Sequence, residues 1–211
     1  HRWPFYIPSW RNEILTESKK LKLEDFGLFE GISETIVTTH HGWAPNAAPM
    51  GIIRKQDTTL IRLFKGSRTY QNILAENFLV ANVTNDPVAF VRYTFSDIQP
   101  DDIETISSPW REFPVLKEAQ SWVAFECINT KITPEALVAE LRPLRGHVNS
   151  FYPKAPNRGL NAILEATIHA TRYKMNGEEK YLKLIDFYED IINKCGGERE
   201  KEALMLLRSH L

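Results

Sequence analysis

A group of cationic and hydroxyl side chains at the start of a short predicted helix is the clearest candidate for chemistry in this sequence. Ser67 is a natural N-cap, Lys65 precedes it in a turn, and Arg68 and Thr69 fall in the first helical turn. A helix N-terminus leaves backbone N–H groups without intrahelical acceptors, and neighbouring Lys, Arg, Ser and Thr side chains add further donors. This combination predicts a phosphate-binding site.

The binding energetics indicate what else such a site needs. No acidic residue occurs between Asp57 and Glu76, so the positive charge is not cancelled along this stretch of chain. Three or four charge-assisted hydrogen bonds contribute about 5–12 kcal/mol in gross terms. Association costs on the order of 4–15 kcal/mol, and micromolar binding requires about 8 kcal/mol net. A flat apolar ring in an adjoining pocket would have to supply the remainder. An ordinary capped helix with solvated basic residues is the alternative interpretation.

Sequence patterns typical of several other enzyme sites do not occur. The sequence contains no G-x-G-x-x-G, P-loop, H-E-x-x-H, G-x-S-x-G or C-x-x-C pattern. His40 and His41 are adjacent in a predicted strand and therefore point to opposite faces, so we expect no metal site there. Cys127 and Cys195 lack metal-ligand spacing and are interpreted as reduced, structural thiols.

The composition is that of an ordinary globular protein. Of 211 residues, 43% are hydrophobic and 25% are charged, which excludes a disordered chain, a collagen or a disulfide scaffold. The 26 Lys and Arg residues against 27 Asp and Glu give a net charge of -1, which argues against a dedicated nucleic-acid binder. No apolar run approaches the roughly 18 residues of a membrane span. The aromatic, proline-broken start lacks the apolar core of a signal peptide. We therefore expect a cytoplasmic protein without membrane association.

The first half of the chain alternates short β-branched or apolar runs with turn residues. The predicted strands cover residues 32–40, 48–54, 59–64, 78–83 and 121–128, with turns at 41–46 and 56–58. Within the third run, Leu60 and Arg62 are expected on the face opposite Ile61 and Leu63. Residues 137–141 fit either a strand or a helix. Short strands separated by turn signals favour an antiparallel sheet or barrel.

The second half is predicted to be helical. Asn157 can N-cap a first helix, a second helix covers residues 178–195 and ends at Gly196-Gly197, and a third runs from about Glu198 to the end. The expected buried stripe of the first helix consists of Leu160, Ile163, Leu164, Thr167, Ile168 and Thr171. The predicted fold class is therefore α+β, an antiparallel β-barrel with a C-terminal helical bundle, divided into domains 1–148 and 149–211.

The order of three motifs resembles a known superfamily. Residues 38–51 (TTHHGWAPNAAPMG), 65–73 (KGSRTYQNI) and 78–82 (FLVAN) are similar to the FMN-binding split β-barrel superfamily of flavin reductases and pyridoxamine-phosphate-oxidase-like proteins. This similarity covers about residues 25–130. Over the whole chain, the sequence most resembles a prokaryotic flavoprotein family that is catalogued as a domain of unknown function and adds a C-terminal helical domain.

The resemblance implies FMN as the cofactor and assigns residues to it. The backbone of Asn46, Ala47, Ala48, Pro49, Met50 and Gly51 would pass beside the isoalloxazine ring; Lys65, Ser67, Arg68 and Thr69 match the phosphate-binding turn; Asn72, Asn82 and Thr84 would line the same cleft. It also implies a C2 homodimer with FMN near the subunit interface. The aromatic residues Trp3, Phe5, Tyr6 and Trp10 are expected to form an arm on the protein body or on the dimer partner, with a cofactor lid as the alternative.

The implied function is that of an FMN-dependent oxidoreductase that exchanges electrons with a small-molecule donor or acceptor. No side chain stands out as a proton donor, so the catalytic residue is left unassigned. His169 is interpreted as a hydrogen-bonded interfacial histidine, and a substrate clamp formed by Arg158 or His147 is the alternative role for this region, which also contains Asn161. Two other functions stay open. One is a non-enzymatic module that holds a flavin or another planar ligand for sensing or storage. The other is a flavin-free protein that binds a phosphate ligand such as pyridoxal phosphate.

Overall fold

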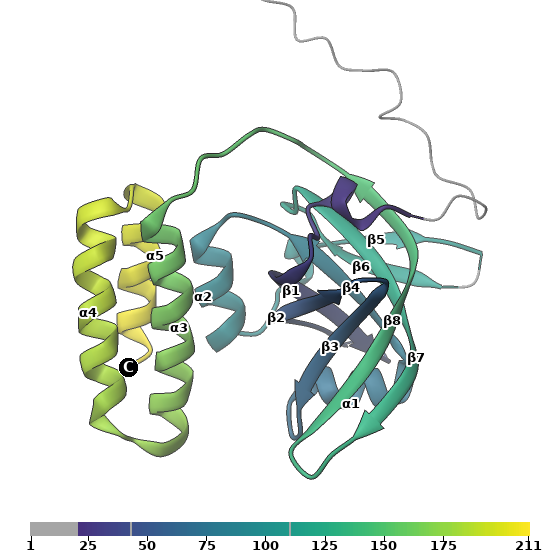
Figure 1. The fold of residues 1–211 in the computed structure, drawn as a ribbon, viewed down its shortest axis with the longest axis horizontal. Helices are drawn as coiled ribbons and strands as arrows, with labels where there is room; N and C mark the ends of the chain where they lie inside the picture. Colours follow the sequence, from purple (N-terminus) through teal and green to yellow (C-terminus); the bar gives the residue numbers. More distant parts are fainter. Residues whose placement is uncertain (1–20, 43, 110) are drawn as a thin grey trace, which may run out of the picture.

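The computed structural model of the protein describes residues 21–42, 44–109 and 111–211. The predicted aromatic arm formed by Trp3, Phe5, Tyr6 and Trp10 lies outside these residues. The described chain forms a β-barrel with a bundle of helices on one side, as Figure 1 shows.

The helices and strands follow in a fixed order along the chain. They are η2 (Leu23–Phe26), β1 (Gly31–His41), β2 (Ala44–Lys55), β3 (Thr58–Phe64), α1 (Arg68–Glu76), β4 (Phe78–Val83), α2 (Pro87–Phe95), η3 (Pro100–Asp102), β5 (Ile103–Ser107), β6 (Glu112–Leu116), β7 (Ser121–Ile132), β8 (Ala136–Val148), α3 (Arg158–Asn176), α4 (Glu179–Cys195) and α5 (Glu198–Ser209).

Six strands close into an antiparallel barrel in the order β1-β2-β3-β8-β7-β4. The barrel closes where β1 pairs with β4, with Ile36 opposite Asn82 and Thr38 opposite Val80. Strands β5 and β6 form a separate two-stranded sheet outside the barrel. Together with the C-terminal helices, this arrangement confirms the predicted α+β fold with an antiparallel barrel.

The barrel interior is filled by alternate residues of its strands. Ile61 and Leu63 of β3 are buried in this core, whereas Arg62 is exposed and Leu60 is half-buried, as the alternation predicted. Val37 of β1 points into the same core. Since side chains of a strand point alternately to its two faces, Thr39 points inward and Thr38 outward. This alternation decides which polar residues of β1 can meet α1.

Several predicted boundaries are corrected by the structure. β2 begins at Ala44 rather than at residue 48, so residues 44–46, which were predicted as turn, belong to a long hairpin with β1. Gly42, at φ 62°, supplies the left-handed conformation that the tighter turn needs. Residues 137–141, for which the sequence left two interpretations open, lie within the strand β8. β7 extends four residues beyond the predicted end, to Ile132.

Five elements have no counterpart among the sequence predictions, namely η2, α2, η3, β5 and β6. The helix α2 is N-capped by Asp86, whose side chain accepts a hydrogen bond from the Val88 N–H at 3.1 Å. β5 and β6 form the outer two-stranded sheet, and Pro114 lies inside β6. These segments are short, and none of them shows the clear hydrophobic periodicity of a helix or a strand. The pattern of apolar residues alone therefore does not identify them.

The buried stripe of α3 is shifted from the one predicted, since Ile163 and Thr167 are buried as expected but other predicted members are not. Ala162, Ala166 and Ala170 of α3 are buried together with Ile163, whereas the predicted stripe member Ile168 is 38% exposed. Small residues let α3 approach its neighbours closely, so the buried face is centred on alanines rather than on the larger aliphatic residues. The stripe also meets Val91 of α2, so a helix from the first half of the chain completes the bundle (Figure 1).

Two glycines bring α3 and the α4–α5 turn into close contact. A Cβ atom on Gly159 would lie 2.5 Å from the Cα atom of Gly196. Gly196 has φ −80°, so it ends α4 in an extended conformation rather than in the left-handed one expected of a C-terminal glycine. The closeness of the two segments therefore requires Gly159, whereas a Cβ on Gly196 would meet the Ile192 carbonyl oxygen at 2.7 Å and Glu200 Cβ at 2.8 Å.

Candidate functional site

The N-terminus of α1 is built as the sequence predicted. The Ser67 hydroxyl accepts a hydrogen bond from the Tyr70 N–H at 3.1 Å and donates one to the Phe64 carbonyl at 3.1 Å. This confirms the predicted N-cap. The first N–H groups of the helix, those of Arg68 and Thr69, have no acceptor within the helix and are left for another partner. Lys65, one turn away, is exposed.

Four polar side chains from three elements meet beside this helix end. The Asn46 amide donates to the Thr69 hydroxyl at 3.0 Å, and the Asn72 amide donates to the Thr39 hydroxyl at 3.0 Å. Thr39 of β1 lies directly opposite Asn46 of β2 in the hairpin. The structure therefore brings together three of the predicted residues, Asn46, Thr69 and Asn72. Thr39 was not singled out from the sequence, although a correctly placed hairpin turn would have set it opposite Asn46.

Within the described part of the chain, one edge of β2 carries no strand partner over residues 44–51. β1 pairs with the whole of β2, whereas β3 pairs only with residues 52–55, and no other described strand adds to β2. The chain therefore leaves β2 open along the predicted cofactor segment, residues 46–51. Ala48, Pro49, Met50 and Gly51 are half-buried there.

The two prolines of β2 show which backbone groups face this open edge. A proline has no N–H, so it fits a strand only where its nitrogen points away from the paired neighbour. Because the N–H and C=O of one residue point to the same side, Pro45 and Pro49 place the odd-numbered residues toward the open edge. The N–H groups of Ala47 and Gly51 are then donors on that edge, flanked by the carbonyls of the same set of residues.

Asn82 lies elsewhere and is engaged within the protein. Its side chain is 0% exposed, and its amide donates to the Ile36 carbonyl at 2.9 Å and to the Thr38 hydroxyl at 3.0 Å. The Leu116 N–H donates to its carbonyl oxygen at 2.9 Å. Thr38 and Thr39 are adjacent in β1 and point to opposite faces, so Asn82 and Asn72 lie on opposite sides of this strand.

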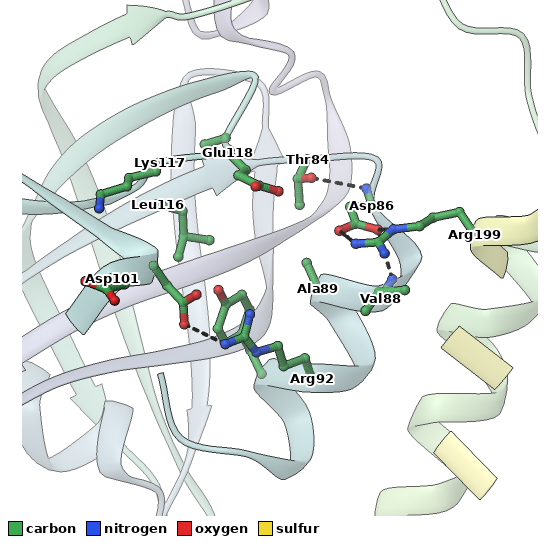
Figure 2. Close-up of a pocket in the computed structure, with 13 residues that line it drawn as sticks. Thr84, Asp86, Val88, Ala89, Arg92, Asp101, Leu116, Lys117, Glu118 and Arg199 are labelled. Carbon is green, nitrogen blue, oxygen red and sulfur yellow. Dashed lines mark hydrogen bonds and ion pairs between the residues drawn. The ribbon is translucent and has the colours of Figure 1, made fainter. Parts of the chain in front are cut away.

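Thr84 is also separate from the group at α1. It follows the last residue of β4 rather than lying on that strand, and its hydroxyl accepts a hydrogen bond from the Asp86 N–H at 3.1 Å. Figure 2 shows Thr84 at one side of a hollow of about 260 Å³ between the barrel, α2 and α5.

The charged groups of that hollow are mostly paired with one another. Arg199 of α5 binds the Asp86 carboxylate at 2.7 Å, and Arg92 binds Asp102 at 3.0 Å (Figure 2). Burial, with the neighbouring Asp102 carboxylate, raises the pKa of Tyr93 to about 12. These ion pairs join α2 to α5 and to η3, so we interpret the charged residues of the hollow as holding these helices together.

The positive charge at α1 is reduced by a residue that is distant in sequence. Arg68 forms an ion pair with Asp97 at 2.9 Å, and both side chains are more than half exposed. The sequence showed no acid near this helix start, so the expectation of an uncancelled positive field is corrected here. An exposed pair of this kind contributes about 1 kcal/mol or less, so Arg68 can exchange Asp97 for a stronger anion at little cost.

The other polar candidates have different surroundings. His169 is 8% exposed and stacks on Tyr181 and Tyr188, with ring centroids 6.0 and 5.7 Å away. It is interfacial, as predicted, but its Nδ1 has no hydrogen-bond partner within the described chain, which corrects the expectation of a hydrogen-bonded group. His147 and Arg158 are exposed, on β8 and at the start of α3.

Neither a metal-binding cluster nor a membrane-spanning helix is found in the part of the chain that the structure describes. No group of three or more His, Cys, Asp or Glu side chains in residues 21–42, 44–109 and 111–211 is arranged to hold a metal ion. Among the helices of the same residues, none combines the length and the hydropathy that crossing a membrane requires.

Comparison with known proteins gives two family matches. The model of a family described as "Protein of unknown function (DUF447) N-terminal domain" matches residues 33–150, and that of a family described as "Protein of unknown function (DUF447)" matches residues 157–209. An uncharacterized protein of Methanocaldococcus jannaschii is 27% identical over a 194-residue alignment, which covers 84% of this chain and 97% of the relative.

Solved structures also resemble this chain. The crystal structure of an FMN-bound protein from Methanosarcina mazei, assigned to DUF447, is 51% identical with a TM-score of 0.86 and covers 90% of this chain and 100% of its own. A flavoredoxin from Methanosarcina acetivorans is 10% identical with a TM-score of 0.49, over 58% of this chain and 72% of its own. Similarity as low as that of the flavoredoxin carries no argument about function.

Proposed function

This chain belongs to the DUF447 family, and from that premise we propose that it is an FMN-binding flavoprotein that acts as an oxidoreductase. The family resemblance seen in the sequence is thereby confirmed. The observation that carries the proposal is the FMN-bound relative from Methanosarcina mazei, because it shares 51% of its residues with this chain and covers 90% of it.

The N-terminus of α1 supports the proposed phosphate contacts. Lys65, Ser67, Arg68 and Thr69 would hold the FMN phosphate, since two N–H groups are free of intrahelical bonds and two cations are exposed beside them. We call these four residues the phosphate seat. The Asn46 amide donates a hydrogen bond to Thr69 of this seat, and the Asn72 amide donates one to Thr39 of the neighbouring strand. The residues present therefore fit an anion of this kind.

The open edge of β2 supports the proposed ring contacts. The backbone of residues 46–51 (Asn46, Ala47, Ala48, Pro49, Met50 and Gly51) would offer N–H and C=O groups to the polar edge of the isoalloxazine. Gly51 leaves room for the neighbouring strand β1, because a Cβ there would lie 2.7 Å from Ile32 Cγ2. Donors that face the pyrimidine edge would stabilise the reduced, anionic form of the ring.

Asn82 and Thr84 complete the proposed set in a supporting role. Asn82 fixes β1 against β4 and β6, and Thr84 fixes the start of α2 through Asp86. Both would hold in place the elements beside the ring rather than touch it.

When bound, FMN supplies hydride and single-electron transfer that side chains cannot perform, and the protein binds, orients and tunes it. The electron donor or acceptor is proposed to be a small molecule. We further propose a homodimer with FMN near the interface, because a second subunit would cover the open edge of β2. The proposed division is 1–148 for the flavin domain and 149–211 for the helical domain. The two free cysteines, Cys127 and Cys195, fit a reducing cytoplasmic location.

The test begins with the protein purified without added cofactor. Its visible spectrum is recorded, and the ligand that heat releases is identified and counted per chain. An oxidised-flavin spectrum with about one FMN per chain is expected. A colourless protein that also fails to bind added FMN would refute the proposal.

Anaerobic reduction separates enzyme from carrier. We expect NADH, NADPH or a photoreduced deazaflavin to bleach the bound flavin, and a small-molecule acceptor to restore it. A flavin that none of these donors reduces would instead favour the alternative of a non-enzymatic binding module for sensing or storage.

A further inference from the structure

A pocket of about 670 Å³ lies at the turn end of the β1–β2 hairpin, beside the β5–β6 sheet. Its walls include Pro45 of β2, Pro100 of η3, Ile103 of β5 and Pro114 of β6. Pockets of this volume with mostly apolar walls are typical of sites for small molecules. None of the residues assigned above to the phosphate or to the ring lines it.

The walls favour a flat apolar ligand. Proline rings are rigid and have no N–H donor, so they offer flat apolar surface that loses little conformational freedom when a ligand binds. Three of the lining residues named above are prolines, from three different elements. A rigid wall of this kind suits a rigid ring.

His40 supplies the polar group. It lines the pocket, and neither of its ring nitrogens has a hydrogen-bond partner within residues 21–42, 44–109 and 111–211. A buried polar atom without a partner is costly and calls for an explanation such as a missing ligand. The imidazole ring packs near Phe78, with centroids 6.4 Å apart, and a rotation about its Cβ–Cγ bond would present a nitrogen to the pocket.

The charges select against anions. Among the described lining residues, Glu112 is the one with a formal charge, and no Lys or Arg is present. A carboxylate at the rim of an apolar pocket disfavours a negatively charged ligand. A neutral ring is thus favoured over a nucleotide or a carboxylic acid.

We propose that this pocket binds a neutral, flat ring compound with one hydrogen-bonding group, which His40 contacts. The binding itself does not depend on FMN. Pro45 of the pocket and Asn46 of the proposed flavin site are consecutive in β2, so their side chains point to opposite faces of the hairpin, and the pocket is a site separate from the Asn46 side chain.

The test uses the full chain as purified, with 2-naphthol as the neutral probe and 2-naphthoate as its anionic match. Binding is measured by equilibrium dialysis, and bound flavin is measured by absorbance in the same samples. We expect 2-naphthol to bind at least about tenfold more tightly than 2-naphthoate, a difference of roughly 1.4 kcal/mol.

Variants then locate the probe. Thr105 is exposed and lines the pocket from β5, so Thr105→Trp should fill it and weaken naphthol binding about tenfold or more. Glu104→Trp is the matched control, because Glu104 is the next residue of the same strand and points to its other face. It should bind naphthol as the unmodified protein does.

His40→Phe tests the polar contact. It keeps a flat ring but removes both nitrogens, so it should weaken naphthol binding about fivefold while leaving unsubstituted naphthalene unaffected. His41→Phe is its control, since His41 points to the other face of β1 and contacts Glu76 at 3.2 Å.

Three results would overturn the proposal: no naphthol binding to the unmodified protein, equal binding by the Thr105→Trp variant, or loss of bound FMN from that variant. The last would assign the pocket to the flavin itself. If the purified protein neither carries nor binds FMN, the proposed function fails, while naphthol binding and its loss in Thr105→Trp still decide the pocket.

Discussion

The side-chain amide of Asn46 donates a hydrogen bond to the Thr69 hydroxyl at 3.0 Å, and so joins β2 to the N-terminus of α1. Thr69 is 1% exposed, so this bond is shielded from water. It ties together the two proposed halves of the flavin site, the open strand edge and the phosphate seat.

A double-mutant cycle tests that connection. Asn46→Ala and Thr69→Val should each lower the free energy of unfolding, and the coupling between them should be about 1 kcal/mol, the net worth of one hydrogen bond. Urea unfolding of the FMN-free proteins measures the free energy of unfolding of each variant, from which the coupling energy follows. Each variant should also weaken FMN binding, because the seat is no longer held against β2. Strictly additive effects would show that the bond contributes nothing.

The phosphate seat is tested by removing its cations. Lys65→Ala combined with Arg68→Ala should weaken FMN binding about 100-fold or more, since two charge-assisted bonds are lost. Fluorescence titration with FMN measures the affinity. The control variant is Lys183→Ala combined with Lys194→Ala, which removes two exposed cations of α4 and therefore has the same net charge as the Lys65/Arg68 variant. Full retention of FMN by the Lys65/Arg68 variant would return this helix start to an ordinary capped helix.

Asn82 is predicted to act through stability. Asn82→Ala leaves the Leu116 N–H and the Ile36 carbonyl without their partner, which should cost about 2–4 kcal/mol of unfolding free energy. Asn129→Ala is the control, because Asn129 is exposed and its amide donates to the Glu140 carboxylate at the surface, and it should change stability by less than about 0.5 kcal/mol. An Asn82→Ala protein of unchanged stability that has lost FMN would instead place Asn82 in contact with the cofactor.

The close contact between α3 and the α4–α5 turn predicts a strong effect at Gly159. A methyl group there would lie 2.5 Å from Gly196 Cα, so Gly159→Ala should destabilise the protein by about 1–3 kcal/mol despite the better helix propensity of alanine. Asn161→Ala, two residues along the same helix and exposed, should be neutral or slightly stabilising. Thermal unfolding of the two variants gives the comparison. Equal melting temperatures would rule out the steric explanation.

His169 predicts a pH dependence of stability. Burial, helped by Arg172 and opposed by Glu165, lowers the pKa of its imidazole below the usual 6.5. As pH falls through 6.5, His169 binds a proton in the unfolded chain but not in the folded protein. The free energy of unfolding therefore decreases until the pH reaches the pKa of His169 in the folded protein. His169→Phe keeps the stacking on the two tyrosines but removes the titratable imidazole, and with it this loss of stability at low pH. Its stability should fall less than that of the unmodified protein between about pH 7 and pH 5. Parallel curves would contradict the assignment.

The local pattern of the chain determined many elements correctly. Ser67 was identified as a cap because a hydroxyl before a helical run bonds an N–H three residues on, and both groups belong to one short segment. Ile61 and Leu63 were placed on one face of their strand, opposite Leu60 and Arg62, because strand alternation depends only on neighbouring residues, and that face is the one in the core. The order of the motifs was also enough to identify the family.

Tertiary structure decided where polar residues from different segments meet. Asn46 reaches Thr69 only because the barrel brings β2 beside α1, and Arg68 meets Asp97 across 29 positions of sequence. The pairing partners of β5 and β6, and the contact of α2 with the C-terminal helices, likewise depend on segments far away in the chain. Hydrophobic periodicity reports which face of a segment is buried. It carries no information on what that face packs against. The sequence by itself therefore determined the helices and strands, whereas their packing in the tertiary structure decided which side chains form the site.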